Sequence, residues 1–349
     1  MKRNYGIDAL RIVSIFMVII LHVMAQGAAI YSVDKGSANY YIFWFLEMAS
    51  FCAVNCFALV SGYVGYGREK KLSSIMSLSA QALFYVIVFT AAGCIAKGAF
   101  DKDFVLASLL AVREGGFWYF KAYLCAWFFF PLIDIAVEKL ERKQLKRMVT
   151  AGFIFFSVVP LIFFADLFRT GLGYTPLWLL VMYFYGAYVK KYGIEENKKP
   201  LKYFLLFLLM SVITWAGVIA IKSVEGKAAS APLWLEHFMS FTSPTVVLSG
   251  VFLFFAFANI KTGKIANAVI KFVSPLTFGV YLVHTQYAVW KFIEEKFMWT
   301  GGLTPINATL SVLGVSIGIF ALCAMVEYVR KLIFKITRID SLIKKADKK

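Results

Sequence analysis

The sequence predicts an all-α, polytopic membrane protein with about ten transmembrane helices. Of its 349 residues, 60% are hydrophobic and only 16% are charged, whereas soluble domains are about 45–50% apolar and about 25% charged. The mean hydropathy is +0.73. The apolar residues fall into segments of about 20, long enough for a helix to cross a hydrocarbon core of about 30 Å. These observations exclude an ordinary soluble protein, and such high hydrophobicity also excludes a disordered chain.

The apolar segments are predicted to be helices, because lipid offers no other partner to the polar groups of the backbone. The first is not a cleaved signal peptide, since its apolar stretch is too long. The sixth is short, and Pro176 is expected to begin it. In chain order the predicted spans are Ile7–Ala28, Tyr41–Tyr63, Ser74–Ala96, Phe117–Val137, Met148–Phe168, Tyr174–Val189, Tyr203–Ile221, Ser240–Ala258, Phe272–Phe292 and Ile306–Tyr328.

Basic residues predict the orientation of the chain. The formal net charge is +17, and Lys and Arg gather before the first span, after every even-numbered span and in the C-terminal tail. The positive-inside rule places these segments, and therefore both termini, in the cytoplasm. We expect a multi-pass protein of the plasma membrane. The charge does not indicate nucleic-acid binding, since no basic domain with interleaved aromatic residues is present.

Two regions are expected, a membrane domain at 1–328 and a basic tail at 329–349. In the tail, apolar residues recur at helical spacing between Lys and Arg, which is typical of a helix on the inner membrane surface. No loop is long enough for a soluble catalytic domain. No internal repeat is visible, which disfavours an inverted-repeat transporter. The five Cys all lie in apolar segments and predict neither disulfides nor a metal site.

Ionisable residues within the spans are the first candidates for function, because they are costly there. Arg11 and His22 lie eleven residues apart, about 16 Å along the axis and about three turns, so they share nearly one face. Separately, snorkelling of Arg11 and an interhelical hydrogen bond of His22 would explain them. Glu47 enters from the outer side to a similar depth. It would either hold the tautomer of His22 or face an outer vestibule.

Six motifs occur in the order found in a known family. They resemble the family's Arg-ten residues-His hallmark, the Ser-Gly-aromatic end of its second helix, its Arg-x-x-Arg loop, the Trp-Tyr/Phe-Leu start of its fourth helix, a late Ser-x-x-Thr-Tyr-Gly-x-Tyr-Leu-x-His run and a final Glu-Lys/Arg-Pro. The family is that of the acyltransferase-3 membrane proteins. In this chain Lys71 replaces the loop's last Arg, and no Pro follows Glu327. The matching segments are Arg11 with His22, Leu59–Tyr63, Arg68–Lys71, Phe117–Phe120, Ser274–His284 and Glu327–Lys331.

The resemblance implies a ten-helix membrane acyltransferase domain at 1–328. It implies transfer of an acyl group, usually acetyl, from cytoplasmic acyl-CoA to a hydroxyl of an extracytoplasmic acceptor such as a cell-surface polysaccharide. No tightly bound cofactor is expected, because acetyl-CoA or another acyl-CoA is the donor substrate. The acceptor, the acyl chain, the oligomeric state and whether His22 receives the acyl group or only a proton stay open.

Acyl transfer to an alcohol needs a base or nucleophile, and an anionic CoA donor needs cations. We assign catalysis to His22, Arg11 and Glu47. The donor phosphates are assigned to the basic loop at the inner mouth, which is also explicable as an ordinary topology signal. A third set is expected to bind the acceptor or line the pore, although its aromatic members also suit an interfacial belt. The second set is Arg68, Lys70 and Lys71; the third is Asn55, Trp118, Tyr119, Lys121, Tyr281 and His284.

Two other classes of function stay open on the residues alone. One is a small-anion transporter with Arg11 and His22 lining its pathway. The other is a membrane sensor or scaffold, in which buried Arg11 and His22 would need another explanation. Turnover of labelled acyl-CoA by the purified protein would separate the three.

Overall fold

The computed structural model describes residues 3–96, 98, 102–103, 105–106, 116–193 and 199–348. Within these ranges every regular element is a helix, which confirms the all-α class. Three basic residues of the predicted cytoplasmic segments, Lys2, Lys198 and Lys349, lie outside the described residues. The helices are α1 (Tyr5–Met24), α2 (Ala38–Ser50), α3 (Ala53–Gly65), α4 (Leu72–Ala96), α6 (Trp118–Trp127), α7 (Phe130–Lys139), α8 (Arg142–Phe153), α9 (Val159–Phe163), α10 (Pro176–Tyr192), α11 (Pro200–Ser223), α12 (Ala231–Phe238), α13 (Pro244–Ala258), α14 (Lys264–Val273), α15 (Thr277–His284), α16 (Tyr287–Ile293), α17 (Pro305–Ile336) and α18 (Ile339–Lys344).

The number of helices that can cross a membrane is smaller than the ten predicted. Among the described residues, seven segments are long and apolar enough, or eight if α6 and α7, bent by 53°, form one broken span. The predicted spans at 174–189 and 240–258 correspond to α10, with 17 residues, and α13, with 15. A helix of 15 residues is about 22 Å long, less than the hydrocarbon thickness of about 30 Å. The count of ten is therefore corrected to seven or eight by length and composition.

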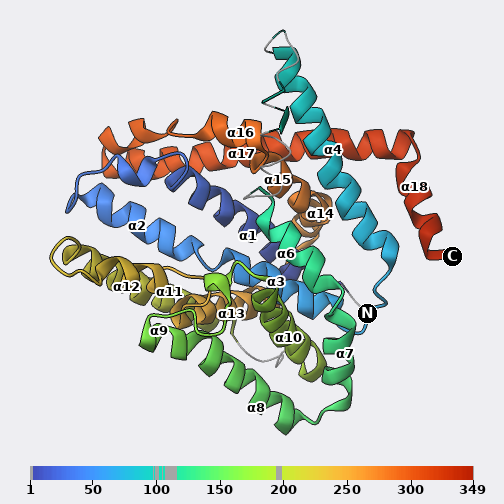
Figure 1. Cartoon of the computed structure of the whole chain (residues 1–349), viewed down its shortest axis with the longest axis horizontal. Coiled ribbons are helices and arrows are strands. Elements are labelled where there is room, and N and C mark those ends of the chain that lie inside the picture. The colour runs from blue at the N-terminus through green and yellow to red at the C-terminus, as the bar shows by residue number, and fades with distance from the viewer. Residues whose placement is uncertain are drawn as a thin grey trace.

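Helix α1 lies at the centre of the helical assembly (Figure 1) and packs against α2, α3, α13, α15 and α17. It begins at an N-cap, where the side chain of Asn4 accepts a hydrogen bond from the backbone N–H of Ile7. One side of the helix is buried in the core through Leu10 and Met24, which are both 0% exposed. The opposite side remains available for a cavity.

Helices α3 and α10 cross in close contact because glycines face each other there. A Cβ at Gly62 would overlap the backbone carbonyl of Tyr183, and one at Gly186 would overlap that of Leu59. Small residues allow such close approach between helices in a membrane. This crossing fixes α3, which carries Phe57 and Ser61 on the wall of the cavity described below.

A buried ion pair within α17 accepts hydrogen bonds from α4. Glu327 accepts hydrogen bonds from Gln81 (2.9 Å) and Tyr85 (2.7 Å) of α4, and Arg330 holds its carboxylate at 2.7 and 2.8 Å. Each carboxylate oxygen therefore has at least one donor, as a buried charge requires. This network holds α4 against the C-terminal half of α17.

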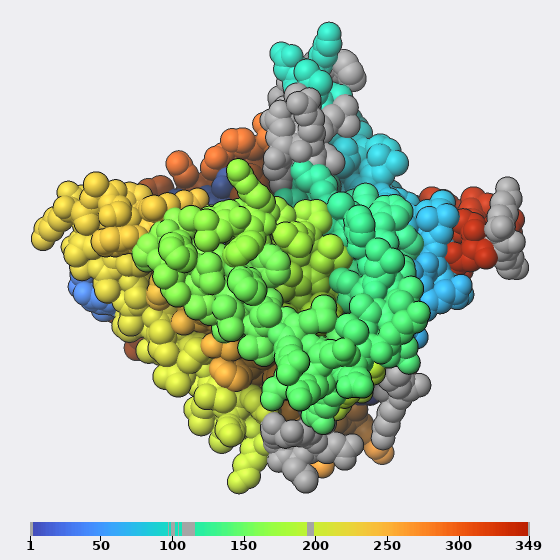
Figure 2. Space-filling model, turned by 60° about the horizontal axis from the view of Figure 1, so that its bottom comes forward, coloured from blue at the N-terminus to red at the C-terminus, as the bar shows by residue number. Residues whose placement is uncertain are grey.

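The start of α1 and helix α18 lie towards the right of Figure 1, and the turn between α11 and α12 lies on the far left. Helix α17 continues to Ile336, past the start of the predicted tail. Arg338 then takes a left-handed backbone conformation with φ of 59°, and α18 turns away from the axis of α17. Figure 2 shows the face covered by residues 116–193, drawn in green beside the yellow α11 and α12.

Candidate active site

A cavity of about 880 Å³ lies beside α1, at the upper end of the usual range of small-molecule sites, about 300–1,000 Å³. Its walls come from α1 to α4, α6, α15 and α16, and from the loops that contain Tyr174 and Phe241. We call it the central cavity. Aromatic and aliphatic side chains form most of its surface, while Arg11, His22 and Glu47 supply its ionisable groups.

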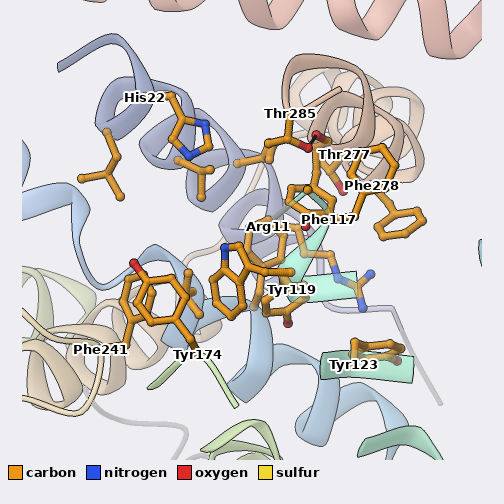
Figure 3. A pocket seen from close by; sticks show the side chains of 18 of the residues that line it. Arg11, His22, Phe117, Tyr119, Tyr123, Tyr174, Phe241, Thr277, Phe278 and Thr285 are labelled. Carbon is orange, nitrogen blue, oxygen red and sulfur yellow. Dashed lines mark hydrogen bonds between the residues drawn. The ribbon is translucent and has the colours of Figure 1, made fainter. Parts of the chain in front are cut away.

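Arg11 and His22 both line the central cavity. Figure 3 shows the two side chains leaving α1 at different levels. Their separation of eleven residues corresponds to about 16 Å along the axis. The shared face inferred from their spacing is therefore confirmed. The cavity extends along α1 from the guanidinium of Arg11 to the imidazole of His22.

His22 is held by a second histidine from α15. Nδ1 of His22 lies 3.0 Å from Nε2 of His284, and Nδ1 of His284 lies 2.6 Å from the carbonyl oxygen of Val280. Because a carbonyl only accepts, Nδ1 of His284 is the donor there, and Nε2 of a neutral His284 is an acceptor. It accepts from Nδ1–H of His22, so a neutral His22 keeps the lone pair on Nε2. This tautomer is the one that a base facing the cavity requires.

The surroundings of this histidine pair fix its geometry further. His284 is 0% exposed and is not among the described residues that line the central cavity. The ring of Trp290 meets the ring of His22 edge-on, with centroids 4.7 Å apart. His284 was expected to bind the acceptor or line the pore, but it contacts the cavity through His22 and holds that ring in place.

Glu47 lines the same cavity, but no hydrogen bond joins it to His22 among the described residues, and Nδ1 of that ring contacts His284 instead. The residue is 5% exposed, and its Oε2 has no hydrogen-bond partner among the described residues. The predicted pairing of Glu47 with His22 is thus corrected, because His284 and not Glu47 holds the tautomer. The alternative, in which Glu47 faces an outer vestibule, stays a prediction, and the structure places Glu47 on the wall of the central cavity.

Arg11 is anchored by an acidic neighbour one turn earlier. Its Nη1 lies 3.2 Å from Oδ1 of Asp8, and the other oxygen of Asp8 accepts from Arg3 at 2.5 Å. This contact uses one of the five N–H groups that a guanidinium offers. The side chain of Arg11 is 30% exposed, so it is positioned by Asp8 and still reaches the cavity.

The three residues of the predicted donor-binding loop are not among the described lining of the central cavity. Nζ of Lys70 donates to Asp134 at 2.6 Å and to two backbone carbonyls at 2.7 and 2.9 Å, so its ammonium group is occupied. Lys71 forms only a loose pair with Glu69, at 3.7 Å, and Arg68 is exposed. The structure therefore separates Lys70, which joins the loop to α7, from the two cations that remain accessible.

The predicted acceptor residues fall into two groups. Trp118, Tyr119 and Tyr281 line the central cavity, whereas Asn55, Lys121 and His284 are not among its described lining. Asn55 is fully buried, donates to the carbonyl of Phe241 (2.8 Å) and accepts from Nε1 of Trp178 (2.9 Å). The prediction that Asn55 lines the pore is corrected, because its amide nitrogen and its amide oxygen are both engaged in hydrogen bonds within the protein.

Part of the cavity could not be identified from the sequence. Four rings form a continuous cluster, which we call the aromatic wall: Phe51, Trp118, Tyr174 and Phe241. The centroid distances are 4.5 Å from Trp118 to Tyr174, 4.9 Å from Tyr174 to Phe241 and 5.2 Å from Phe241 to Phe51. Figure 3 shows Tyr174 and Phe241 side by side. Only Trp118 belongs to a recognisable motif; the others are common residue types at span ends and in loops.

No group of three or more His, Cys, Asp or Glu side chains within the described ranges could hold a metal ion. The comparisons with known proteins add one finding. A family model described as an acyltransferase domain matches residues 4–328, nearly the whole chain. No curated protein and no solved structure matches the chain. The matched region contains the central cavity, both histidines and the basic loop.

Proposed function

The chain belongs to the acyltransferase-3 family, and on that premise we propose that it moves an acetyl group from cytoplasmic acetyl-CoA to a hydroxyl of an extracytoplasmic glycan. One observation carries the chemical part of this proposal. The imidazole of His22, with its Nε2 lone pair free, shares a cavity with the guanidinium of Arg11. Such a site offers a base for the acceptor and a cation for the donor.

The proposed reaction is a direct acyl transfer. Nε2 of His22 takes the proton from the acceptor hydroxyl, whose oxygen bonds to the carbonyl carbon of the thioester. The carbon–sulfur bond then breaks, and the CoA sulfur receives the proton from the imidazolium. Nδ1–H of His22 stays hydrogen-bonded to His284 throughout, so the imidazole returns to its starting tautomer.

Arg11 is proposed to attract the donor. CoA is strongly anionic, and a guanidinium binds phosphate oxygens through a planar fork of donors. Arg11 lies about 16 Å from His22 along α1, and a long, uncharged pantetheine arm separates the phosphates of CoA from its thioester. The phosphates would therefore stay near Arg11 while the thioester reaches His22.

The orientation of the chain is proposed to place both termini in the cytoplasm. Reporter domains fused at the C-terminus and at Gly226, in the turn after α11, should report opposite sides of the membrane. The basic loops motivate this expectation, and the two positions lie at opposite ends of the protein in Figure 1. Reporters on the same side would contradict the topology.

Arg68 and Lys71 are proposed to guide acyl-CoA to the inner mouth. The double variant Arg68→Gln/Lys71→Gln should bind acetyl-CoA about 2–30-fold more weakly, in line with the small worth of exposed ion pairs. Its binding should also depend less on salt, because exposed charge pairs are screened. Titration of the purified protein with acetyl-CoA at low and high salt measures both effects.

The matched control for this prediction is Lys143→Gln/Lys146→Gln, which removes the same charge from exposed positions of α8. That variant should bind acetyl-CoA like the wild type. If the two double variants weaken binding equally, the loop contributes only general charge. Lys70 is left intact because its loss would break the ion pair with Asp134.

The function itself is tested by incubating the purified protein with acetyl-CoA and an oligosaccharide acceptor. Release of free CoA thiol, together with gain of an acetyl ester on the oligosaccharide, is the expected result. A protein that moves small anions across vesicles but releases no thiol would instead support the transporter interpretation.

A further inference from the structure

One ionisable group of the central cavity has no task in the reaction described above. Glu47 is 5% exposed, its Oε2 has no hydrogen-bond partner, and it forms no ion pair within the described residues. A buried carboxylate without a partner is costly, and it can only accept hydrogen bonds while it is ionised. A ligand that brings a donor or a positive charge would remove that cost.

The neighbours of Glu47 narrow the kind of ligand. Phe51 of the aromatic wall follows one turn later in the chain, and Glu47 lies close enough to Tyr174 and Tyr31 for its charge to act on both phenols. Both Phe51 and Tyr174 face the central cavity with Glu47. A carboxylate therefore stands beside clustered aromatic rings in one concave site.

No cationic side chain pairs with Glu47 among the described residues. His22 is neutral in the tautomer described above, and Arg11 lies about 16 Å away from it along α1 and is already paired with Asp8. Aromatic faces attract cations, most strongly where water is excluded. A carboxylate together with the aromatic wall favours a positively charged group over a neutral hydroxyl and disfavours an anion.

We propose that Glu47 and the aromatic wall form an acceptor subsite for a protonated amine, so that the acceptor carries an ammonium group near the hydroxyl that is acylated. Calling this ligand the acceptor rests on the proposed function. The binding of an amine is inferred from the residues of the cavity alone. Glu47 pairs with the ammonium group, the rings of Tyr174 and Trp118 pack against it, and the hydroxyl is left to His22.

The test compares glucosamine with glucose, which share a ring and differ by an amine. Binding of each sugar to the purified full-length protein is measured by calorimetric titration at constant pH, without acetyl-CoA. The wild type should bind glucosamine at least about 10-fold more tightly, and Glu47→Gln should lower glucosamine affinity by about 10–100-fold. The ratio between the two sugars should then fall close to one.

Two sets of variants sharpen the result. Glu236→Gln removes the same charge from an exposed site on α12, outside the described cavity lining, and should keep the wild-type preference. Tyr174→Phe keeps the aromatic face and should keep the preference, whereas Tyr174→Leu should reduce it. Circular dichroism confirms that each variant is folded before it is titrated.

The proposal is overturned if the wild type binds the two sugars equally or binds neither, or if Glu47→Gln keeps the preference for the amine. Equal weakening of both sugars would show that Glu47 binds hydroxyls, which also contradicts the proposal. Because the titration needs no donor, loss of this inference leaves acetyl transfer untouched. Conversely, a protein that prefers glucosamine but never consumes acetyl-CoA would contradict the proposed function alone.

Discussion

Replacing His22 by alanine should lower the rate of acetyl transfer by about 10²–10⁴-fold, the usual contribution of a general base. The variant should still insert in the membrane and bind acetyl-CoA, since Arg11 and the basic loop remain. The measurement is kcat for thiol release under saturating donor, paired with a donor-binding titration. Added imidazole should restore part of the rate, because the substitution leaves space for a small base.

His237 provides the matched control for this prediction. It lies on α12, and its Nδ1 contacts the carbonyl of Leu233 in the same helix at 3.1 Å. It is not among the described residues of the central cavity, so His237→Ala should keep the wild-type rate. A folded His22→Ala protein with full activity would contradict the role of His22 as the general base.

His284→Leu should lower kcat by about 10–100-fold, the effect typical of a residue that orients an active group from behind. The substitution leaves Nδ1–H of His22 without its acceptor, so the imidazole can rotate or adopt the wrong tautomer. His284→Gln retains an acceptor oxygen at similar reach and should recover part of the loss. The quantities to compare are kcat and KM for the donor in the two variants.

A purely structural role for His284 would give a different pattern. Both variants would then lose thermal stability together, and kcat of the remaining folded protein would be unchanged. If His284→Leu were inactive and His22→Ala active, the roles of the two histidines would be reversed. The hydrogen bond from His284 to Val280 makes that reversal unexpected, because it holds a proton on the far nitrogen.

The sequence predicted what depends on local spacing. Helical periodicity alone placed Arg11 and His22 on one face of α1, and they share one cavity. Composition and segment length predicted a helical membrane protein. The number of spans was harder to predict. Helix α13 is shorter than the segment drawn from hydropathy at 240–258, because loop residues such as Phe241 were counted within that span.

Contacts between residues far apart in the chain explain why the structure differs from the predictions for three site residues. The partner of His22 comes from a helix more than 250 positions later, and depth alone could not decide whether Glu47 or another residue would contact His22. In the sequence, Lys70 is one of three equivalent basic residues in a loop, and only the folded structure brings Asp134 of α7 beside it. Asn55 lies at the depth of a pore, but Trp178 and the Phe241 carbonyl take both ends of its amide. Each case depends on which helices meet, and spacing within one helix carries no such information.

The most direct test of the account uses proteoliposomes that enclose an oligosaccharide and carry the purified protein. Acetyl-CoA labelled in its acetyl group is added outside, and the enclosed oligosaccharide is analysed for the label. Labelled ester should accumulate inside vesicles with the wild type, and its rate should fall by about 10²–10⁴-fold with His22→Ala. Equal labelling with both proteins, or none with a wild type that binds acetyl-CoA, would contradict acyl transfer at His22.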